Sequence, residues 1–262
     1  MTDVLRYEVA DRVATLTLHR PEARNALNRQ LRAELVDAVL RADSDDEVDV
    51  VILTGADPAF CAGLDLKELG SGGLDLGTVG GGEAGGPTRG PLPRVDVPII
   101  GAINGVAVTG GFELALACDF LVASERARFA DTHARVGVQP GWGLTVLLPE
   151  AVGVRRAKEL SATGNFLDAH TALTWGLVNH VVAHEDLLPH CRRLAADIVS
   201  NDRAGVRRIY RTYDQGALLS GEDAWMLEGR VAAEWLQGGG GRAEDIEARR
   251  GSIAERGRSQ AE

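Results

Sequence analysis

Two glycine-containing turns in the sequence could bind an anion. The first, residues 60–66 (FCAGLDL), follows a short apolar run, and the second, residues 104–114 (NGVAVTGGFEL), follows another. At a helix N-terminus, backbone N–H groups lack partners within the helix, and glycines let a ligand approach them closely. Two such groups aimed at one point form an oxyanion hole, which stabilises an enolate or a tetrahedral anion formed from a thioester. Tight packing of a strand against a helix explains either turn taken alone.

A carboxylate stands beside the second turn. Glu113 lies in the first turn of a predicted helix whose next residues, LALAC, are apolar. Burying a carboxylate among apolar side chains is costly unless it is paired, caps the helix or takes part in a reaction. Glu113 is therefore either a catalytic acid or base, or a helix cap.

Alternating hydrophobic patterns predict an α/β core that positions these residues. VATLTLH has the period of two that a half-buried strand requires, and DVVILT is a short apolar run bounded by turn residues. The predicted strands are 4–10, 12–18, 49–54, 97–103, 120–123, 127–129 and 177–182, with Asp11 and Arg12 as the turn between the first two. Strands that alternate with helical segments indicate an α/β fold.

Helical periodicity fills the remaining segments. Residues 28–42 have an apolar stripe with Asn28 as N-cap, and residues 168–176 begin at Asp168 and end at Gly176. We predict further helices from Thr109 to Cys118, from Trp142 to about Ser161 with breaks at Pro149 and Gly153, and through most of the chain after Glu185. Ten glycines among residues 70–90 make ordering this segment costly in backbone entropy, which predicts a flexible loop, either over a site or simply in solvent.

Composition excludes several classes of protein. The 262 residues carry a formal charge of -10, which is unfavourable for a general nucleic-acid binder. The three cysteines and six histidines have no metal-ligand spacing that predicts a metal site, and we expect the cysteines to be buried free thiols. The N-terminus has no apolar signal segment, and Asn104 and Glu113 interrupt the apolar stretch 98–118, so we expect a cytoplasmic protein without a membrane span.

The order of these motifs resembles the crotonase (enoyl-CoA hydratase/isomerase) superfamily over nearly the whole chain. Taken together they are specific, although each is weak alone. The matching segments are RPEARNAL (20–27), FCAGLDL (60–66), PIIGAING (98–105), GGFEL (110–114), Cys118-Asp119, Phe129-Ala130, Val136-Gly137, PGWG (140–143) and TALTWGLV (171–178).

The resemblance implies a fold and a set of site residues. The fold is a spiral of ββα units, here predicted over residues 1–200, followed by a C-terminal helical oligomerisation region at 201–262. The implied oxyanion donors are the amides of Leu64 and Gly110, and Glu113 is an implied catalytic acid or base. The positions implied to bind coenzyme A or the acyl group are Arg24, Ala62, Asp65, Leu66, Lys67 and Trp142. Solvated surface charges are the alternative for Arg24 and Lys67, and a core tryptophan is the alternative for Trp142.

The sequence departs from the family pattern at its second catalytic glutamate. His133 occupies that position, in the segment Phe129-Ala130-Asp131-Thr132-His133. An imidazole can donate or accept a proton near neutral pH, and Asp131 would orient it if residues 131–133 are extended, because both side chains would then face the same side. A hydrogen-bonded structural histidine is the competing interpretation.

The resemblance implies an enzyme that acts on an acyl-CoA thioester. The first hypothesis is reversible addition of water to a 2-enoyl-CoA, a hydro-lyase reaction in fatty acid metabolism that needs no cofactor besides its coenzyme A substrate. Double-bond isomerisation or another reaction at the same oxyanion hole is the alternative, because of the histidine at position 133. A non-catalytic acyl-CoA binder is the third. Relatives of this kind assemble as homotrimers or as hexamers built from two trimers.

Overall fold

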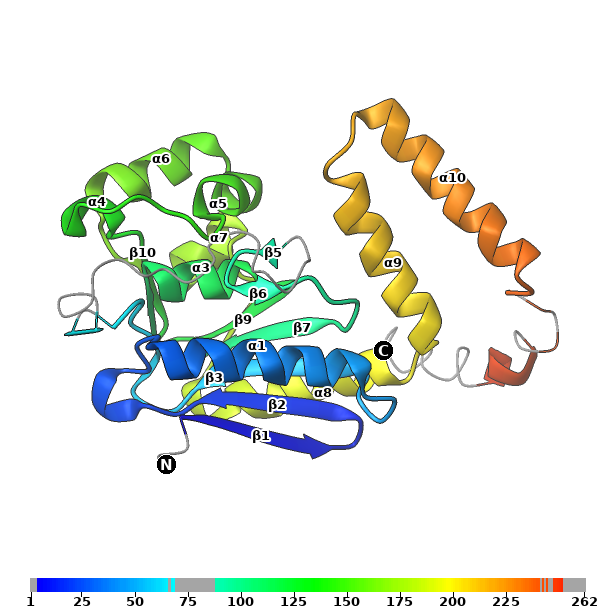
Figure 1. Ribbon diagram of the computed structural model, residues 1–262, viewed down its shortest axis with the longest axis horizontal. Helices are drawn as coiled ribbons and strands as arrows, with labels where there is room; N and C mark the ends of the chain where they lie inside the picture. Colours follow the sequence, from blue (N-terminus) through cyan, green and yellow to red (C-terminus); the bar gives the residue numbers. More distant parts are fainter. Residues whose placement is uncertain are drawn as a thin grey trace. The chain divides into compact units, whose positions relative to one another are not determined.

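The computed structural model describes residues 4–65, 67–68, 88–240, 242, 244 and 247–251 (Figure 1). Contacts divide the chain into two compact units, residues 1–207 and 208–262, and the division falls within helix α9 (Arg203–Gly216). The predicted boundary at residue 200 lies just before this helix. Both glycine turns, Glu113 and His133 belong to the first unit.

A six-stranded sheet forms the centre of the first unit. Its order is β1 (Leu5–Ala10), β2 (Val13–Leu18), β3 (Val50–Gly55), β7 (Ile99–Ile103), β9 (Phe120–Ser124) and β12 (His180–Val182). β1 and β2 are an antiparallel hairpin whose turn residues, Asp11 and Arg12, have positive φ, as the predicted turn requires. The remaining neighbours pair in parallel.

Both faces of the central strands of this sheet are buried, because their residues alternate between two cores. Val50 and Ile52 on β3 pack into a cluster with Leu187 and Cys191 of helix α8 (Leu187–Val199). Their neighbours on the same strand point to the opposite face, where the core includes helix α1 (Arg29–Ser44) (Figure 1). A parallel strand covered on both faces explains why DVVILT is apolar throughout.

A second sheet of four strands carries the site. Its order is β11 (Leu167–Asp168), β10 (Arg128–Ala130), β8 (Val106–Val108) and β4 (Ala59–Cys61), and the last three are parallel. The chain passes from the large sheet to the small one and then into a helix: β7 to β8 to α3 (Gly110–Leu116), and β9 to β10 to α4 (His133–Val136). This repeated order is the predicted spiral of ββα units.

Most predicted helices are present, with one correction. Asn28 caps α1 by accepting a hydrogen bond from the amide of Leu31, and Asp168 caps α7 (Ala169–Trp175) in the same way. Pro149 lies inside α5 (Leu144–Val152) without ending it, so the predicted break there was wrong; Gly153 alone separates α5 from α6 (Val154–Thr163). Two short 3-10 helices complete this unit, at Pro21–Ala23 and His184–Asp186.

Part of the glycine-rich segment can be compared with its prediction. Residues 70–87 lie outside the described part of the chain. Residues 88–90 are not a loop: β5 (Thr88–Arg89) pairs with β6 (Leu92–Pro93), and Gly90, with φ of +75°, lies in the turn between them.

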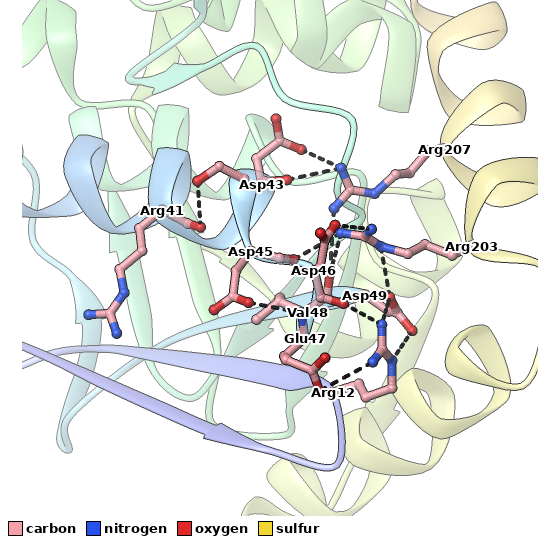
Figure 2. Close-up of polar contacts among 11 residues, drawn as sticks. Arg12, Arg41, Asp43, Asp45, Asp46, Glu47, Val48, Asp49, Arg203 and Arg207 are labelled. Carbon is pink, nitrogen blue, oxygen red and sulfur yellow. Dashed lines mark hydrogen bonds and ion pairs between the residues drawn. The ribbon is translucent and has the colours of Figure 1, made fainter.

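Acidic residues around the end of α1 and the start of β3 bind the beginning of α9 (Figure 2). Asp49, with a side chain only 9% exposed, lies 2.7 Å from Nε of Arg12 and 3.0 Å from Nε of Arg203. Arg207 lies 3.0 Å from the carboxylate of Asp43. We call these five residues the arginine–aspartate cluster. It joins the first residues of α9 to acidic residues of the first unit.

The described residues of the second unit are mainly helical. It contains the later turns of α9 and helix α10 (Gly221–Gln237), whose N-cap is Ser220. Arg208 lies 3.4 Å from the ring centre of Trp235. Large apolar side chains on α10 are exposed, among them Trp225 (77%) and Met226 (67%).

Candidate active site

The two glycine turns lie against each other at one edge of the small sheet. β4 and β8 are parallel neighbours, so the turns that follow them start at the same edge. A side chain on Gly63 would lie 2.8 Å from the carbonyl oxygen of Val108, and one on Gly111 would lie 2.1 Å from that of Cys61. No Cβ atom fits at either distance, so this close contact between backbones requires both glycines.

The segment 20–27 holds the first turn in place. The amide of Leu27 donates to the carbonyl of Gly63 at 2.7 Å, and the amide of Asp65 donates to the carbonyl of Leu27 at 3.2 Å. Asn25, fully buried, donates to the carbonyls of Ala56 and Ala59, both at 2.7 Å. The conspicuous RPEARNAL motif is therefore a support for the 60–66 turn.

These contacts leave the amides of Leu64 and Gly110 available. Neither amide donates a hydrogen bond to a group in the described parts of the chain. Gly110 is the first residue of α3, where an intrahelical acceptor is missing. The Leu64 nitrogen lies 3.6 Å from where a Cβ atom on Gly110 would stand, so the two residues are close neighbours. They match the predicted pair of donors.

Glu113 is buried and hydrogen-bonded, but it does not cap its helix. The residue is 2% exposed, its Oε1 accepts the backbone N–H of Trp142 at 2.8 Å, and its Oε2 lies 3.4 Å from Nε2 of His133. Capping would require a bond to an amide of the first turn of α3, and the carboxylate instead reaches residues from two other segments. The capping alternative is therefore wrong.

His133 connects Glu113 to a second carboxylate. Its Nδ1 donates to Oδ1 of Asp131 at 2.7 Å, and its backbone amide donates to the same oxygen at 3.1 Å. The predicted pairing with Asp131 is present, but its basis was wrong: residues 131–133 are not extended, because His133 begins α4 and Thr132 has a ψ of 15°. Asp131 reaches the ring across a tight turn.

The two carboxylates decide the charge of the imidazole. Burial disfavours the imidazolium, but the hydrogen bond with Asp131 and the interaction with Glu113 outweigh burial and raise the pKa of His133 to about 9. Burial also acts to raise the pKa of Asp131, but its hydrogen bonds with His133 and Ser161 hold that pKa below the ordinary value. At neutral pH the ring of His133, which lies between Asp131 and Glu113, is therefore protonated.

A cavity of about 110 Å³ brings these groups together. Glu113 and His133 line it together with Leu64 and Gly110, which carry the available amides. Trp142 is 7% exposed and also lines the cavity, so it is both a core residue and a wall of the site. The other lining residues are Ala62, Val108, Thr109, Thr132, Val136, Val138, Gln139 and Gly141.

The residues predicted to contact coenzyme A do not all lie at the cavity. Ala62 lines the cavity, whereas Arg24, Asp65 and Lys67 do not. Asp65 pairs with Arg20 at 2.9 Å, and Arg24 and Lys67 have exposed side chains. Leu66 lies outside the described residues.

Two features of the cavity could not be predicted from the sequence. The hydroxyls of Thr109 and Thr132 are 2.5 Å apart, and both residues line the cavity. Thr109 has a φ of 54°, which is rare for a β-branched residue, but no sequence pattern predicts such a backbone. The Trp142 amide that binds Glu113 was also missed, because the two residues belong to separate segments.

Two other expectations concern cysteines and metals. All three cysteines are free and buried, as predicted, and burial raises the pKa of Cys61 and of Cys191 to about 12.

Within the described ranges, no group of three or more metal-binding side chains occurs, and no helix has the length and apolar character needed to cross a membrane.

The fold and this site define an α/β protein in which two residues with available backbone amides and a buried acid line one cavity. A family model for enoyl-CoA hydratase/isomerase matches residues 8–237. The chain belongs to the enoyl-CoA hydratase/isomerase family.

Individual relatives agree with this assignment. The chain is 41% identical to "Probable enoyl-CoA hydratase 1, peroxisomal" of Arabidopsis thaliana, over 86% of this chain and 84% of that protein. A crystal structure of enoyl-CoA hydratase from Mycobacterium tuberculosis H37Rv is 48% identical, with a TM-score of 0.75 over 88% of this chain and 98% of that one. A monofunctional enoyl-CoA isomerase from M. smegmatis is 32% identical, with a TM-score of 0.72 over 86% and 99% of the two chains. The predicted crotonase fold is thereby confirmed.

Proposed function

We propose that this protein catalyses the reversible addition of water to a 2-enoyl-CoA. One observation carries the proposal: the available amides of Leu64 and Gly110 belong to residues that line the same cavity as the Glu113 carboxylate. Two amide donors suit the oxygen of a thioester whose negative charge grows during the reaction, and a carboxylate beside them can activate water. Relatives named as hydratases support this choice.

The reaction follows from the positions of the ionised groups. Glu113 takes a proton from water as the water oxygen bonds to Cβ, and the electron pair of the double bond moves onto the thioester oxygen. Leu64 and Gly110 stabilise that enolate through their amides. His133 then gives its Nε2 proton to Cα. The proton held by Glu113 can return to His133 across the 3.4 Å between Oε2 and Nε2, which restores the starting state.

Hydration of crotonyl-CoA tests the proposal directly. The purified protein should remove the absorbance of the conjugated thioester, and Glu113→Gln should reduce kcat by about a hundredfold or more, since a positioned acid or base typically contributes ~10²–10⁴-fold. Glutamine keeps an oxygen for the Trp142 amide, so the fold should persist. The matched control is Glu125→Gln, at an exposed glutamate in the turn after β9, which should leave kcat unchanged. Absence of turnover on enoyl thioesters of every chain length would reject hydration.

Double-bond isomerisation is the second candidate. Position 133 holds histidine where the family pattern has its second glutamate, and one structural relative is named as an isomerase. Mass spectrometry of the products separates the reactions, because an isomer keeps the mass of its substrate and a hydrate gains one water. Tight binding of an acyl-CoA without any product would instead indicate a binding protein.

The remaining features of the proposal concern the coenzyme and the assembly. Coenzyme A enters as part of the substrate, and the reaction needs no other cofactor. Arg24 and Lys67 are proposed partners for its phosphates, while Asp65 and Leu66 flank its path. A cytoplasmic homotrimer, or a hexamer of two trimers, is the proposed form, and light scattering of the purified protein measures its mass in solution.

A further inference from the structure

The most unusual feature of the site is the buried carboxylate behind the histidine. Asp131 is 1% exposed and does not line the cavity, yet one of its oxygens accepts two hydrogen bonds from His133. We infer that Asp131 is a positioning residue that keeps His133 protonated and directs Nε2 of the ring toward the substrate. The part of this inference that concerns catalysis rests on the proposed function.

The geometry leaves the imidazole one orientation. Nδ1 lies 2.7 Å from Oδ1 of Asp131, and Nε2 lies 3.4 Å from Oε2 of Glu113. Rotating the ring by half a turn would place a carbon atom against the Asp131 carboxylate and remove one of the hydrogen bonds to that buried charge, which is costly. Only Nε2 can therefore face Glu113 and the substrate.

The surrounding charges favour the protonated ring. Asp131 faces it from the turn before α4, and Glu113 faces it from α3. From α6, the Ser161 hydroxyl binds Asp131, and this stabilises the carboxylate. Arg135, the cation nearest in sequence, instead donates to the carbonyl of Thr163. Two carboxylates against one imidazole outweigh its burial, which agrees with a pKa of about 9 for His133.

The consequence is a proton donor that is ready at neutral pH. A buried imidazole that had only Glu113 as partner would lose its proton more easily, and a neutral ring could not give a proton to Cα and still donate from Nδ1. Asp131 thus supplies the negative charge that keeps the ring protonated. With that charge, a histidine can donate a proton from the position where the family has a glutamic acid.

Asp131→Asn is the test, because asparagine keeps an acceptor for Nδ1 and removes the charge. In protein labelled with ¹⁵N-histidine, with His133→Gln used to assign the signal, the wild-type ring should remain protonated up to about pH 9. In Asp131→Asn its titration should move toward the ordinary value of about 6.5. With crotonyl-CoA, the alkaline loss of kcat/KM should move in the same direction, and the rate at pH 8 should fall by up to about thirtyfold, because a shift of the ring pKa from about 9 to about 6.5 lowers its protonated fraction at that pH by this factor.

A matched control and clear outcomes complete the experiment. Asp168→Asn removes a carboxylate from the N-cap of α7, where asparagine also caps well, so neither the titration nor the rate should change. The inference is overturned if wild-type His133 titrates near pH 6.5, or if Asp131→Asn leaves both profiles unchanged. Should Asp131→Asn fail to fold, a wild-type titration of His133 near pH 6.5 still overturns the inference. The absence of turnover in the wild type would reject the proposed function, whereas the titration would still report what Asp131 does to the ring.

Discussion

Replacing Gly110 by alanine tests whether the two amides form an oxyanion hole. An added Cβ would lie 3.0 Å from Cζ3 of Trp142 and 3.6 Å from the Leu64 nitrogen. The distance to Trp142 is shorter than a normal carbon contact, so the Trp142 ring must move. The methyl group would also lie beside the amide of Leu64. A methyl group that keeps the thioester oxygen away from the Leu64 amide would remove one oxyanion donor. Losing one such donor typically costs ~10²–10³-fold in kcat, about 2.7–4 kcal/mol. We expect a loss of at least a hundredfold.

The fold should tolerate this change, which makes the assay specific. Alanine is favoured over glycine in a helix by about 1 kcal/mol, and this offsets part of the contact with Trp142. Initial rates with crotonyl-CoA give kcat, and thermal unfolding reports stability, which should change by only a few degrees. The control is Gly229→Ala in α10, where a Cβ atom would meet no other atom within 4 Å, and its kcat should equal that of the wild type. If Gly110→Ala keeps kcat within threefold of the wild type, the oxyanion assignment is wrong.

Three further predictions concern stability. Asn25→Ala should lower the free energy of unfolding by about 3 kcal/mol in urea titrations, because it removes a buried side chain bonded to three backbone groups; an unchanged midpoint would contradict its supporting role. Asp49→Asn should cost about 1–3 kcal/mol, since Arg12 and Arg203 lose their shared carboxylate, and a cost that does not shrink at high salt would show that charge is not the cause (Figure 2). His133, with a folded pKa of about 9 against about 6.5 unfolded, contributes stability that is complete below pH 6.5 and is lost as pH rises through 9. The difference in free energy of unfolding between wild type and His133→Gln should fall between about pH 6.5 and 9. A difference that stays constant over this range would refute the raised pKa of His133.

Local chemistry explains which parts of the fold could be predicted. Asn28 and Asp168 act as caps because each side chain bonds an amide only three residues away, so the sequence contains the whole interaction. Pro149 was misread for the opposite reason. Proline opposes a helix locally, but in α5 it lies between the buried side chains of Leu148 and Val152, whose packing outweighs its local effect.

The site was predictable only in part, because it is assembled from distant segments. The resemblance to the family, carried by two motifs in a specific order, implied Leu64 and Gly110 as donors, and both residues line the cavity. The Trp142 amide on Glu113 depends on how α5 packs against α3, and no pattern near either residue indicates it. The partnership of Asp131 with His133 was foreseen from their spacing, although the turn that creates it was not.

The charges of the site explain how a histidine can occupy the position of the family's second glutamate. Two glutamates that share one proton carry a net charge of -1 between them. Glu113, His133 and Asp131 carry the same total when both carboxylates are ionised and the ring is protonated. Histidine alone, without Asp131, would leave a neutral ring or a site with no net charge. If His133 acts in place of the glutamate, we therefore expect it to need Asp131, and relatives with histidine at this position should also have an acidic residue two positions earlier.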